Sequence, residues 1–99
     1  MAYHIGVKCR LDSRDGRPIL GEGRAELLEL VDEKGSLSEA AREMGMSYRY
    51  AWGMVRKVSE AAGGPVVESS RGGSQGGRTS LTPLGRELIA TFRRVEDAL

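Results

Sequence analysis

Residues 35–52, which read GSLSEAAREMGMSYRYAW, decide the fold. Gly35 is suited to end one helix, and Ser36, with a glutamate three residues later, forms the pattern of a capping box that starts the next. That short helix contains two adjacent alanines and stops at Gly45, and Ser47 is a plausible cap for a longer helix. A short helix, a tight glycine turn and a longer helix are typical of a helix-turn-helix, although two ordinary antiparallel helices would share this pattern.

The flanking segments extend this pattern to a winged helix. Upstream, residues 22–34 place leucines and a valine on one helical face. Downstream, a GGP break at 63–65 is followed by a short strand at 66–68, a glycine-rich loop at 71–78, a returning strand at 79–81 and a final helix. Thr82 and Pro83 suit the cap and the first position of that helix. This order predicts a mainly α (α+β) winged helix-turn-helix.

The N-terminal segment has the pattern of a β-hairpin. Apolar side chains alternate with polar or small residues, as expected of a half-buried strand, at Tyr3, Ile5, Val7, Cys9 and Leu11. A DSRDG turn at 12–16 then permits residues 17–20 to return as a second strand. We therefore expect a single domain over residues 1–99, with the hairpin in 1–21, three helices in 22–62, the wing in 65–81 and a dimerisation helix in 82–99.

Composition excludes several functional classes. The 99 residues carry 15 lysines and arginines against 14 acidic residues, so a net charge of +1 does not by itself indicate nucleic-acid binding. One cysteine and one histidine offer no metal site and no disulfide, and the sequence has neither a membrane-length apolar run nor a signal peptide. We expect a cytoplasmic protein without a metal or cofactor.

The cations are unevenly distributed. Between Ser47 and Arg78 lie five basic residues against only two glutamates. A local basic surface can bind phosphates even on a near-neutral chain, although a solvated charged surface explains the same distribution.

The third helix separates into two faces on a helical wheel. Its predicted core arc holds Ala51, Val55, Val58 and Ala62, and the opposite side holds Arg49, Gly53, Arg56 and Glu60, with Tyr50 and Lys57 on one flank. Arg49, near the N-terminus, is the best candidate for a guanine edge, because its fork matches two acceptors. Tyr50 suits a thymine methyl or a phosphate, and Arg56 and Lys57 suit phosphates. Gly53 permits close approach to DNA or is simply a tolerated exposed glycine.

Other residues complete the predicted DNA-binding surface. Tyr48 and Trp52 flank the core arc, and Trp52 is expected to pack rather than to stack on bases. The glycine-rich wing, flanked by Arg71 and Arg78, suits a minor groove or the DNA backbone. The full predicted DNA-binding set is Ser36, Ser38, Ser47, Tyr48, Arg49, Tyr50, Gly53, Arg56, Lys57, Arg71, Ser74, Gln75 and Arg78.

Catalytic functions find no support in the sequence. Residues 72–79, GGSQGGRT, approach a phosphate-loop pattern, but Arg78 stands where lysine is required and the following helix opens too late. No nucleophile–base pair, metal cluster or carboxylate pair lies in a recognisable site. We expect no enzyme activity.

The last helix carries an apolar stripe. Steps of four, four, three and four residues connect Leu84, Leu88, Phe92, Val95 and Leu99. Such a face favours pairing with a second copy, although the N-terminal hairpin or first helix of the same chain would also cover it. A two-fold dimer predicts a pseudo-palindromic DNA site.

The segments 35–41 and 44–52 closely resemble the N-terminal DNA-binding domain of the molybdate-responsive ModE regulator family. The glycines of 72–77 and LTPLG at 81–85 match its wing and the start of its dimerisation helix, so the likeness runs from about Leu20 to Phe92. The third helix and GGPVV at 63–67 are more distantly similar to the DNA-binding domain of LysR-type regulators. The resemblance implies a winged helix that dimerises through its N- and C-terminal elements and reads DNA with the helix from Ser47 and the wing.

The resemblance also bears on effectors. Family members often carry further C-terminal domains that bind molybdate, and this sequence ends where they would begin. Direct molybdate binding is therefore not expected, which leaves room for a separate effector-sensing protein. The predicted function is sequence-specific binding of double-stranded DNA by a homodimeric transcriptional regulator. The alternatives are a non-specific nucleoid-type DNA binder, against which the near-neutral charge argues mildly, and a winged-helix protein-interaction module.

Overall fold

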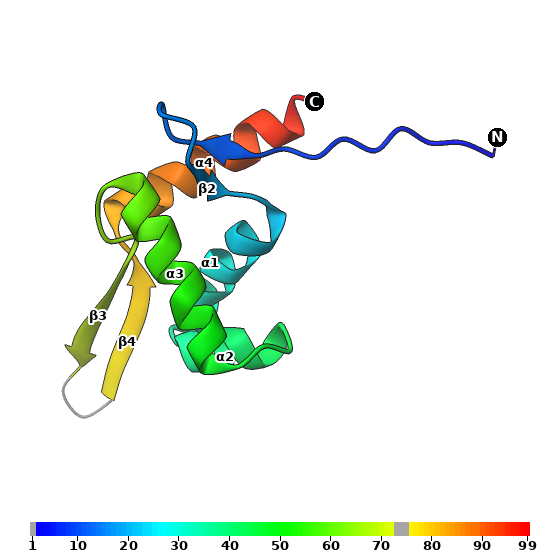
Figure 1. Cartoon of the computed structure of the whole chain (residues 1–99). Helices are drawn as coiled ribbons and strands as arrows, with labels where there is room; N and C mark the ends of the chain where they lie inside the picture. Colours follow the sequence, from blue (N-terminus) through cyan, green and yellow to red (C-terminus); the bar gives the residue numbers. More distant parts are fainter. Residues whose placement is uncertain (1, 73–75) are drawn as a thin grey trace.

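The computed structural model of the chain describes residues 2–72 and 76–99, without the side chains of residues 71–76. Its elements follow the order β1–β2–α1–α2–α3–β3–β4–α4, with one two-stranded sheet near the N-terminus and a second forming the wing (Figure 1). The fold is a small α+β winged helix, as predicted.

Three of the four helices begin at the caps expected from sequence. The Oγ of Ser36 accepts the Glu39 amide at 3.1 Å before α2 (Leu37–Glu43), and the Oγ of Ser47 accepts the Tyr50 amide at 3.1 Å before α3 (Tyr48–Ala62). Thr82 precedes α4 (Pro83–Asp97), with Pro83 in the first turn. The first helix, α1 (Glu22–Lys34), ends at Gly35, whose φ of 71° is the left-handed conformation that glycine adopts easily.

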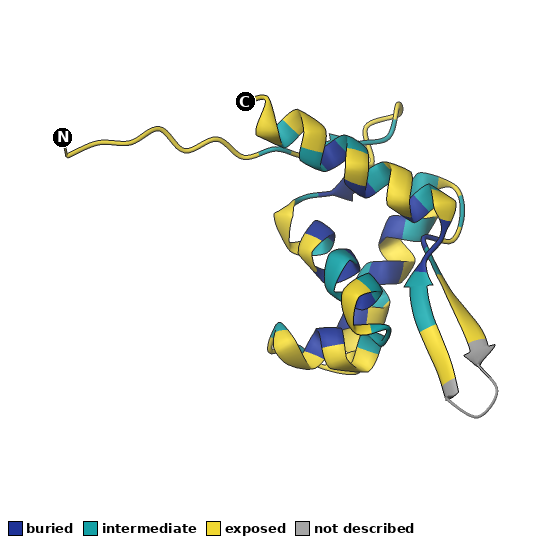
Figure 2. Ribbon diagram, turned by 180° about the vertical axis from the view of Figure 1, so that it is seen from behind, coloured by how far each residue is buried: buried dark blue, intermediate teal, exposed yellow. Residues whose placement is uncertain are grey.

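The hydrophobic core lies around α1. Helix α1 contributes Leu27, Leu28 and Val31, all buried, and it packs against α2, α3, α4 and β4. Figure 2 shows the buried positions of the helices facing this centre. The largest side chains that are almost wholly buried are Phe92, Leu20, Leu27, Leu28, Val31, Val58 and Val66.

The wing strands are longer than the sequence predicted. Strands β3 (Val67–Gly72) and β4 (Gly76–Leu81) pair antiparallel from Val67 opposite Leu81 to Gly72 opposite Gly76. Most of the expected glycine-rich loop is therefore strand. A Cβ at Gly77 would lie 2.8 Å from the carbonyl oxygen of Ser70, so this glycine permits the close strand pairing.

The N-terminal hairpin is present but shorter than predicted. Only β1 (Leu11–Asp12) pairs with β2 (Pro18–Leu20), around a turn in which the Ser13 amide donates to the Arg17 carbonyl at 2.8 Å. In the described part of the chain the expected strand from Tyr3 onward is not paired before Leu11, and the returning strand β2 has only three residues. Residues 2–10 instead form an extended arm that runs beside α4 and beyond it (Figure 1).

Two polar clusters fix α1 against the wing and α4. Asp32 accepts the Leu81 amide at 3.1 Å with one oxygen and lies 3.3 Å from the Arg86 guanidinium with the other. Arg93 on α4 contacts Glu22 at 2.7 Å, Glu29 at 2.6 Å and Glu96 at 2.7 Å. The hydrogen bonds that Arg93 donates to these carboxylates, first of all to Glu29, raise the pKa of Arg93.

Candidate nucleic-acid interface

The third helix presents a polar face that the rest of the fold leaves uncovered. Its apolar side is buried through Ala51, Val55 and Val58, as expected, with Ala62 partly buried against the core. Arg49, Tyr50, Arg56 and Lys57 are exposed, and the side chain of Tyr50 is 63% accessible. The helical period thus separates a core side from a side able to contact a large ligand.

The turn between α2 and α3 sets the position of this face. Gly45 adopts a φ of 70°, and the Met46 amide donates to the Ala41 carbonyl at 3.0 Å. Ala40 and Ala41 are buried, so their small side chains allow α2 to lie close to the core. The helix-turn-helix pattern read from these residues therefore corresponds to a packed pair of helices.

The serines of the predicted set lie in different settings. The hydroxyl oxygens of Ser36 and Ser47 accept helix amides, whereas Ser38 is exposed in the first turn of α2. Ser36 and Ser47 therefore position α2 and α3.

Trp52 does not pack in the core, contrary to the prediction. Its side chain is 44% exposed, and the guanidinium of Arg56 lies 5.3 Å from the centre of its ring. Ala51 and Val55 already occupy the part of α3 that faces the core, so the indole of Trp52 lies at the edge of the core and not within it. Arg56 also contacts Glu60 at 3.7 Å, which offsets part of its charge.

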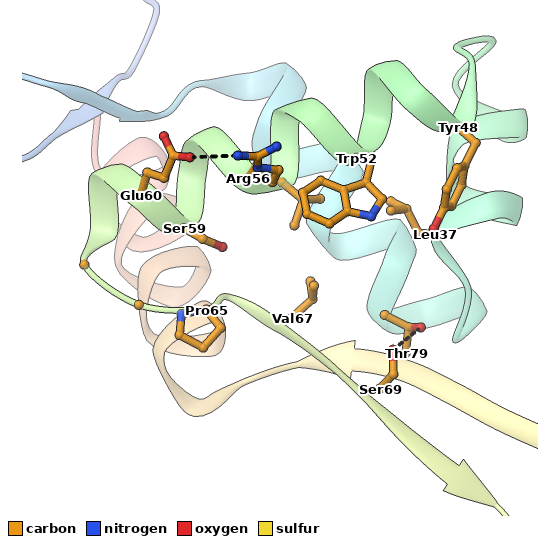
Figure 3. Close-up of a pocket in the computed structure, with 13 residues that line it drawn as sticks. Leu37, Tyr48, Trp52, Arg56, Ser59, Glu60, Pro65, Val67, Ser69 and Thr79 are labelled. Carbon is orange, nitrogen blue, oxygen red and sulfur yellow. Dashed lines mark hydrogen bonds and ion pairs between the residues drawn. The ribbon is translucent and has the colours of Figure 1, made fainter.

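A groove of about 650 Å³ separates α3 from the wing (Figure 3). Trp52 and Tyr48 extend from α3, and Pro65, Val67 and Thr79 lie on the opposite wall. This groove marks the side of the polar face next to the wing.

Arg78 lies against α1, although the sequence pattern predicts that it reaches DNA from the wing. Its Nη2 donates to the carbonyl oxygen of Asp32 at 2.6 Å, and its side chain covers Gly35, where a Cβ would collide with the guanidinium. The Thr79 amide donates to the Gly35 carbonyl at 2.9 Å. Arg78 therefore anchors the base of the wing to the C-terminus of α1, where unpaired carbonyls favour a cation.

The remaining predicted wing residues have no described side chains. The backbone of Arg71 belongs to β3, and Ser74 and Gln75 lie outside the described residues.

The predicted dimer stripe is only partly accessible. Phe92 is 1% exposed and belongs to the chain's own core, contrary to its assignment to an interface with a second copy. Leu84 and Leu88 are half-buried against that core, while Val95 is 47% and Leu99 69% exposed. Ile89, which the stripe omitted, is also buried, so the inner face of α4 is broader than the sequence pattern indicated.

Residues 2–72 and 76–99 contain neither a candidate metal site nor a membrane-spanning helix. No group of three or more histidine, cysteine or acidic side chains in these ranges is placed to hold a metal ion. No helix in the described part of the chain is long and apolar enough to cross a membrane.

Two arginines that lie beside α3 were not predicted as site residues from the sequence. Arg24 of α1 shares a shallow depression with Arg49, Tyr50 and Lys57, and Arg17 lies with Arg24 and Lys57 in a neighbouring one. No local pattern connects these residues, because the chain brings them together only when β2 and α1 pack against α3.

Comparison with known proteins places the chain among regulators. MopA of Rhodobacter capsulatus, a molybdenum-pterin-binding protein, is 41% identical over 86 residues, which cover 87% of this chain and 32% of MopA. The molybdenum transport protein ModE of Azotobacter vinelandii is 38% identical over 77 residues, covering 78% of this chain and 28% of that protein. The DNA-binding transcriptional dual regulator ModE of Escherichia coli strain K12 is 33% identical over 69 residues, covering 70% of this chain and 26% of that protein.

The chain spans about a third or less of the length of these relatives. The resemblance to ModE read from residues 35–52 is confirmed. The family model described as bacterial regulatory helix-turn-helix protein, lysR family, matches residues 24–86, from α1 into the first turn of α4. The chain therefore belongs to the lysR family of bacterial regulatory helix-turn-helix proteins.

Proposed function

We propose that this chain binds double-stranded DNA with sequence preference, as a non-enzymatic transcriptional regulator. The observation that carries this proposal is the uncovered polar face of α3, on which Arg49, Tyr50, Arg56 and Lys57 are exposed beside a wing. An α-helix with its side chains is about 10–12 Å wide, and the major groove is about 12 Å wide. The relative from E. coli, whose name describes a DNA-binding transcriptional regulator, supports the same function.

Two arginines of this face have separate roles in the proposed complex. Arg49 lies in the first turn of α3, where a docked recognition helix goes deepest, and its fork suits a guanine edge. Arg56 stacks on Trp52 and contacts Glu60, so its guanidinium is oriented before DNA arrives. Such a position suits a phosphate contact, which fixes register without reading sequence.

The functional unit in this proposal is a homodimer. The extended arm carries Tyr3, Ile5 and Val7 at 84%, 92% and 64% exposure, beside α4 with its exposed Val95 and Leu99. Two such arms paired antiparallel about Gly6 would place Ile5 opposite Val7 on a shared apolar face, because both residues have the same strand parity. A second copy therefore fits this surface, and a two-fold dimer would favour a pseudo-palindromic DNA site.

The experiment is a titration of labelled duplexes with the purified chain, read by fluorescence anisotropy. The duplex is one enriched from a random pool, and a scrambled duplex of the same length is the comparison. Arg49→Ala is expected to weaken binding to the enriched duplex by roughly tenfold or more and to relax preference at one base pair, as loss of a bidentate contact does. Arg94→Ala removes one exposed charge from α4 and serves as the matched control.

Two other outcomes would support the alternative functions. Equal affinity for every duplex, with steep salt dependence, would indicate a non-specific binder. No affinity for any duplex would favour a protein-interaction module. In either case the assignment of α3 as a reader of sequence would be wrong.

A further inference from the structure

A group of cations lies on the side of α3 that faces away from the wing. Arg17 from the turn before β2, Arg24 from α1 and Lys57 from α3 line one shallow depression together with Pro18, Glu60 and Ala61. Arg24 and Lys57 also line the adjoining depression with Arg49. We call Arg17, Arg24 and Lys57 the basic flank.

The geometry of α3 separates the basic flank from the wing. With about 100° between successive residues, Tyr48, Trp52 and Ser59 form the side of α3 that lines the groove beside the wing. Tyr50, Lys57 and Ala61, which line the depressions of the basic flank, lie roughly 180° around the helix from that side. Arg49, Gly53 and Arg56 fall between these two sides.

Arg24 is held in place without losing its charge. Its Nη1 donates to the carbonyl oxygens of Pro18 at 3.3 Å and Ile19 at 3.2 Å. Both acceptors are neutral, so the guanidinium is oriented but not neutralised. An oriented side chain loses less conformational freedom when it binds an anion.

Two acidic side chains near the basic flank, Asp15 and Glu60, each have another partner. Glu60 lies 3.7 Å from Arg56, and Asp15, near Arg17, accepts a hydrogen bond from the Ser13 hydroxyl, which lowers the pKa of Asp15. Among the ion pairs of the described residues, none includes Arg17, Arg24 or Lys57. The cations of the basic flank therefore remain available to an external anion, with part of the charge of Arg17 offset by Asp15.

A helix lying in a major groove has a phosphate backbone on each side. If the wing accompanies one backbone, the other passes the opposite side of α3, where the basic flank lies. We infer that Arg17, Arg24 and Lys57 bind the phosphates of this second backbone and so fix α3 in the groove from both sides. This inference rests on the proposed function, and it adds Arg17 and Arg24 to the interface with DNA.

The test compares Arg17→Gln, Arg24→Gln and their combination with wild type on the enriched and scrambled duplexes. Salt is varied between about 50 and 200 mM, and each lost phosphate contact should reduce the slope of log affinity against log salt by about 0.9. At about 0.1 M salt each single variant should then bind roughly tenfold more weakly, equally on both duplexes. The ratio between the two duplexes should stay at the wild-type value. Arg94→Gln, the matched control on α4, should change neither affinity nor slope.

Two variants separate charge from folding. Arg17 contributes a backbone carbonyl to its turn, so Arg17→Gln leaves that hydrogen bond in place. Arg24→Lys keeps the charge and should retain most of the salt slope, whereas a purely structural role would make lysine as harmful as glutamine. Thermal unfolding of each variant verifies that the fold persists.

The outcomes distinguish this inference from the function on which it rests. If wild type binds the enriched duplex with preference and the double variant matches its affinity and salt slope, the basic flank does not contact DNA. If wild type binds no duplex, the proposed function itself fails. A change in sequence preference in the double variant would also overturn the inference, because phosphate contacts carry no direct sequence information.

Discussion

Gly85 lies in the first turn of α4, where the helix crosses the chain that enters the wing. It is buried, and its amide donates to the Thr82 hydroxyl at 3.0 Å. An added methyl group would collide with the carbonyl oxygen of Val66 and would lie 3.2 Å from the carbonyl carbon and 3.3 Å from a methyl of Leu81. That carbonyl oxygen accepts the Thr82 amide at 3.0 Å, so it cannot move away without weakening the hydrogen bond.

Gly85→Ala should therefore destabilise the protein, although alanine is the better helix former. The exchange gains about 1 kcal/mol of helix propensity. Against this, overpacking a buried site costs about 1–3 kcal/mol, and a weakened hydrogen bond adds about 0.5–1.5 kcal/mol. The net loss in the free energy of unfolding is about 0.5–3.5 kcal/mol, and each 1 kcal/mol lowers the Tm by about 4–8 °C in a domain of this size.

The assay is urea and thermal unfolding followed by circular dichroism, with Gly53→Ala as the matched control. Gly53 also lies inside a helix, but a Cβ there meets no atom within 4 Å apart from its chain neighbours and the helix's own backbone. Gly53→Ala should raise stability by up to about 1 kcal/mol. If Gly85→Ala were as stable as wild type or more so, the close approach of α4 to Val66 would be refuted.

Three further predictions concern the site and the clusters that support it. Gly53→Ala should weaken DNA binding despite its greater stability, because the added methyl lies on the face proposed to approach DNA; undiminished affinity in anisotropy would show that this face stays clear of the duplex. Asp32→Ala removes the acceptor of the Leu81 amide and should cost about 1–3 kcal/mol in urea unfolding, whereas Glu33→Ala, at the exposed neighbouring position, should cost less than about 0.5 kcal/mol. The hydrogen bonds from Arg93 lower the pKa of Glu22 from its ordinary value of 4.5, so the stability difference between wild type and Arg93→Ala should be full above that pH and shrink as pH falls through the lowered pKa. A difference that grows on acidification would contradict this ion pair.

Local patterns predicted the helices well. A serine or threonine at Ser36, Ser47 and Thr82 satisfies helix amides only a few residues away, so the sequence near each cap contains the whole interaction. The polar face of α3 was likewise predictable, because it depends on the helical period alone. The order of a strand, a glycine-rich loop and a returning strand also predicted the wing, but its strand lengths depend on pairing across Gly77 and were underestimated.

Contacts between distant segments could not be predicted from the sequence. Arg78 turns toward the carbonyl of Asp32, 46 residues earlier, and no local pattern indicates that meeting. Phe92 continues an apolar stripe, but periodicity does not distinguish a residue buried in its own chain from one that awaits a partner. Trp52 lies at the edge of the core arc. Whether a side chain at that position is buried or exposed depends on how much of it the neighbouring wing covers, and the helical period does not indicate this.

The most direct test of sequence-specific recognition by α3 is selection of bound duplexes from a random pool by wild type and by Arg49→Ala. We predict that wild type enriches a split, pseudo-palindromic motif and that Arg49→Ala loses preference at one symmetric pair of positions in that motif. No enrichment by wild type, or the same motif enriched by both proteins, would contradict the assignment of α3 and Arg49 as the reader of DNA sequence.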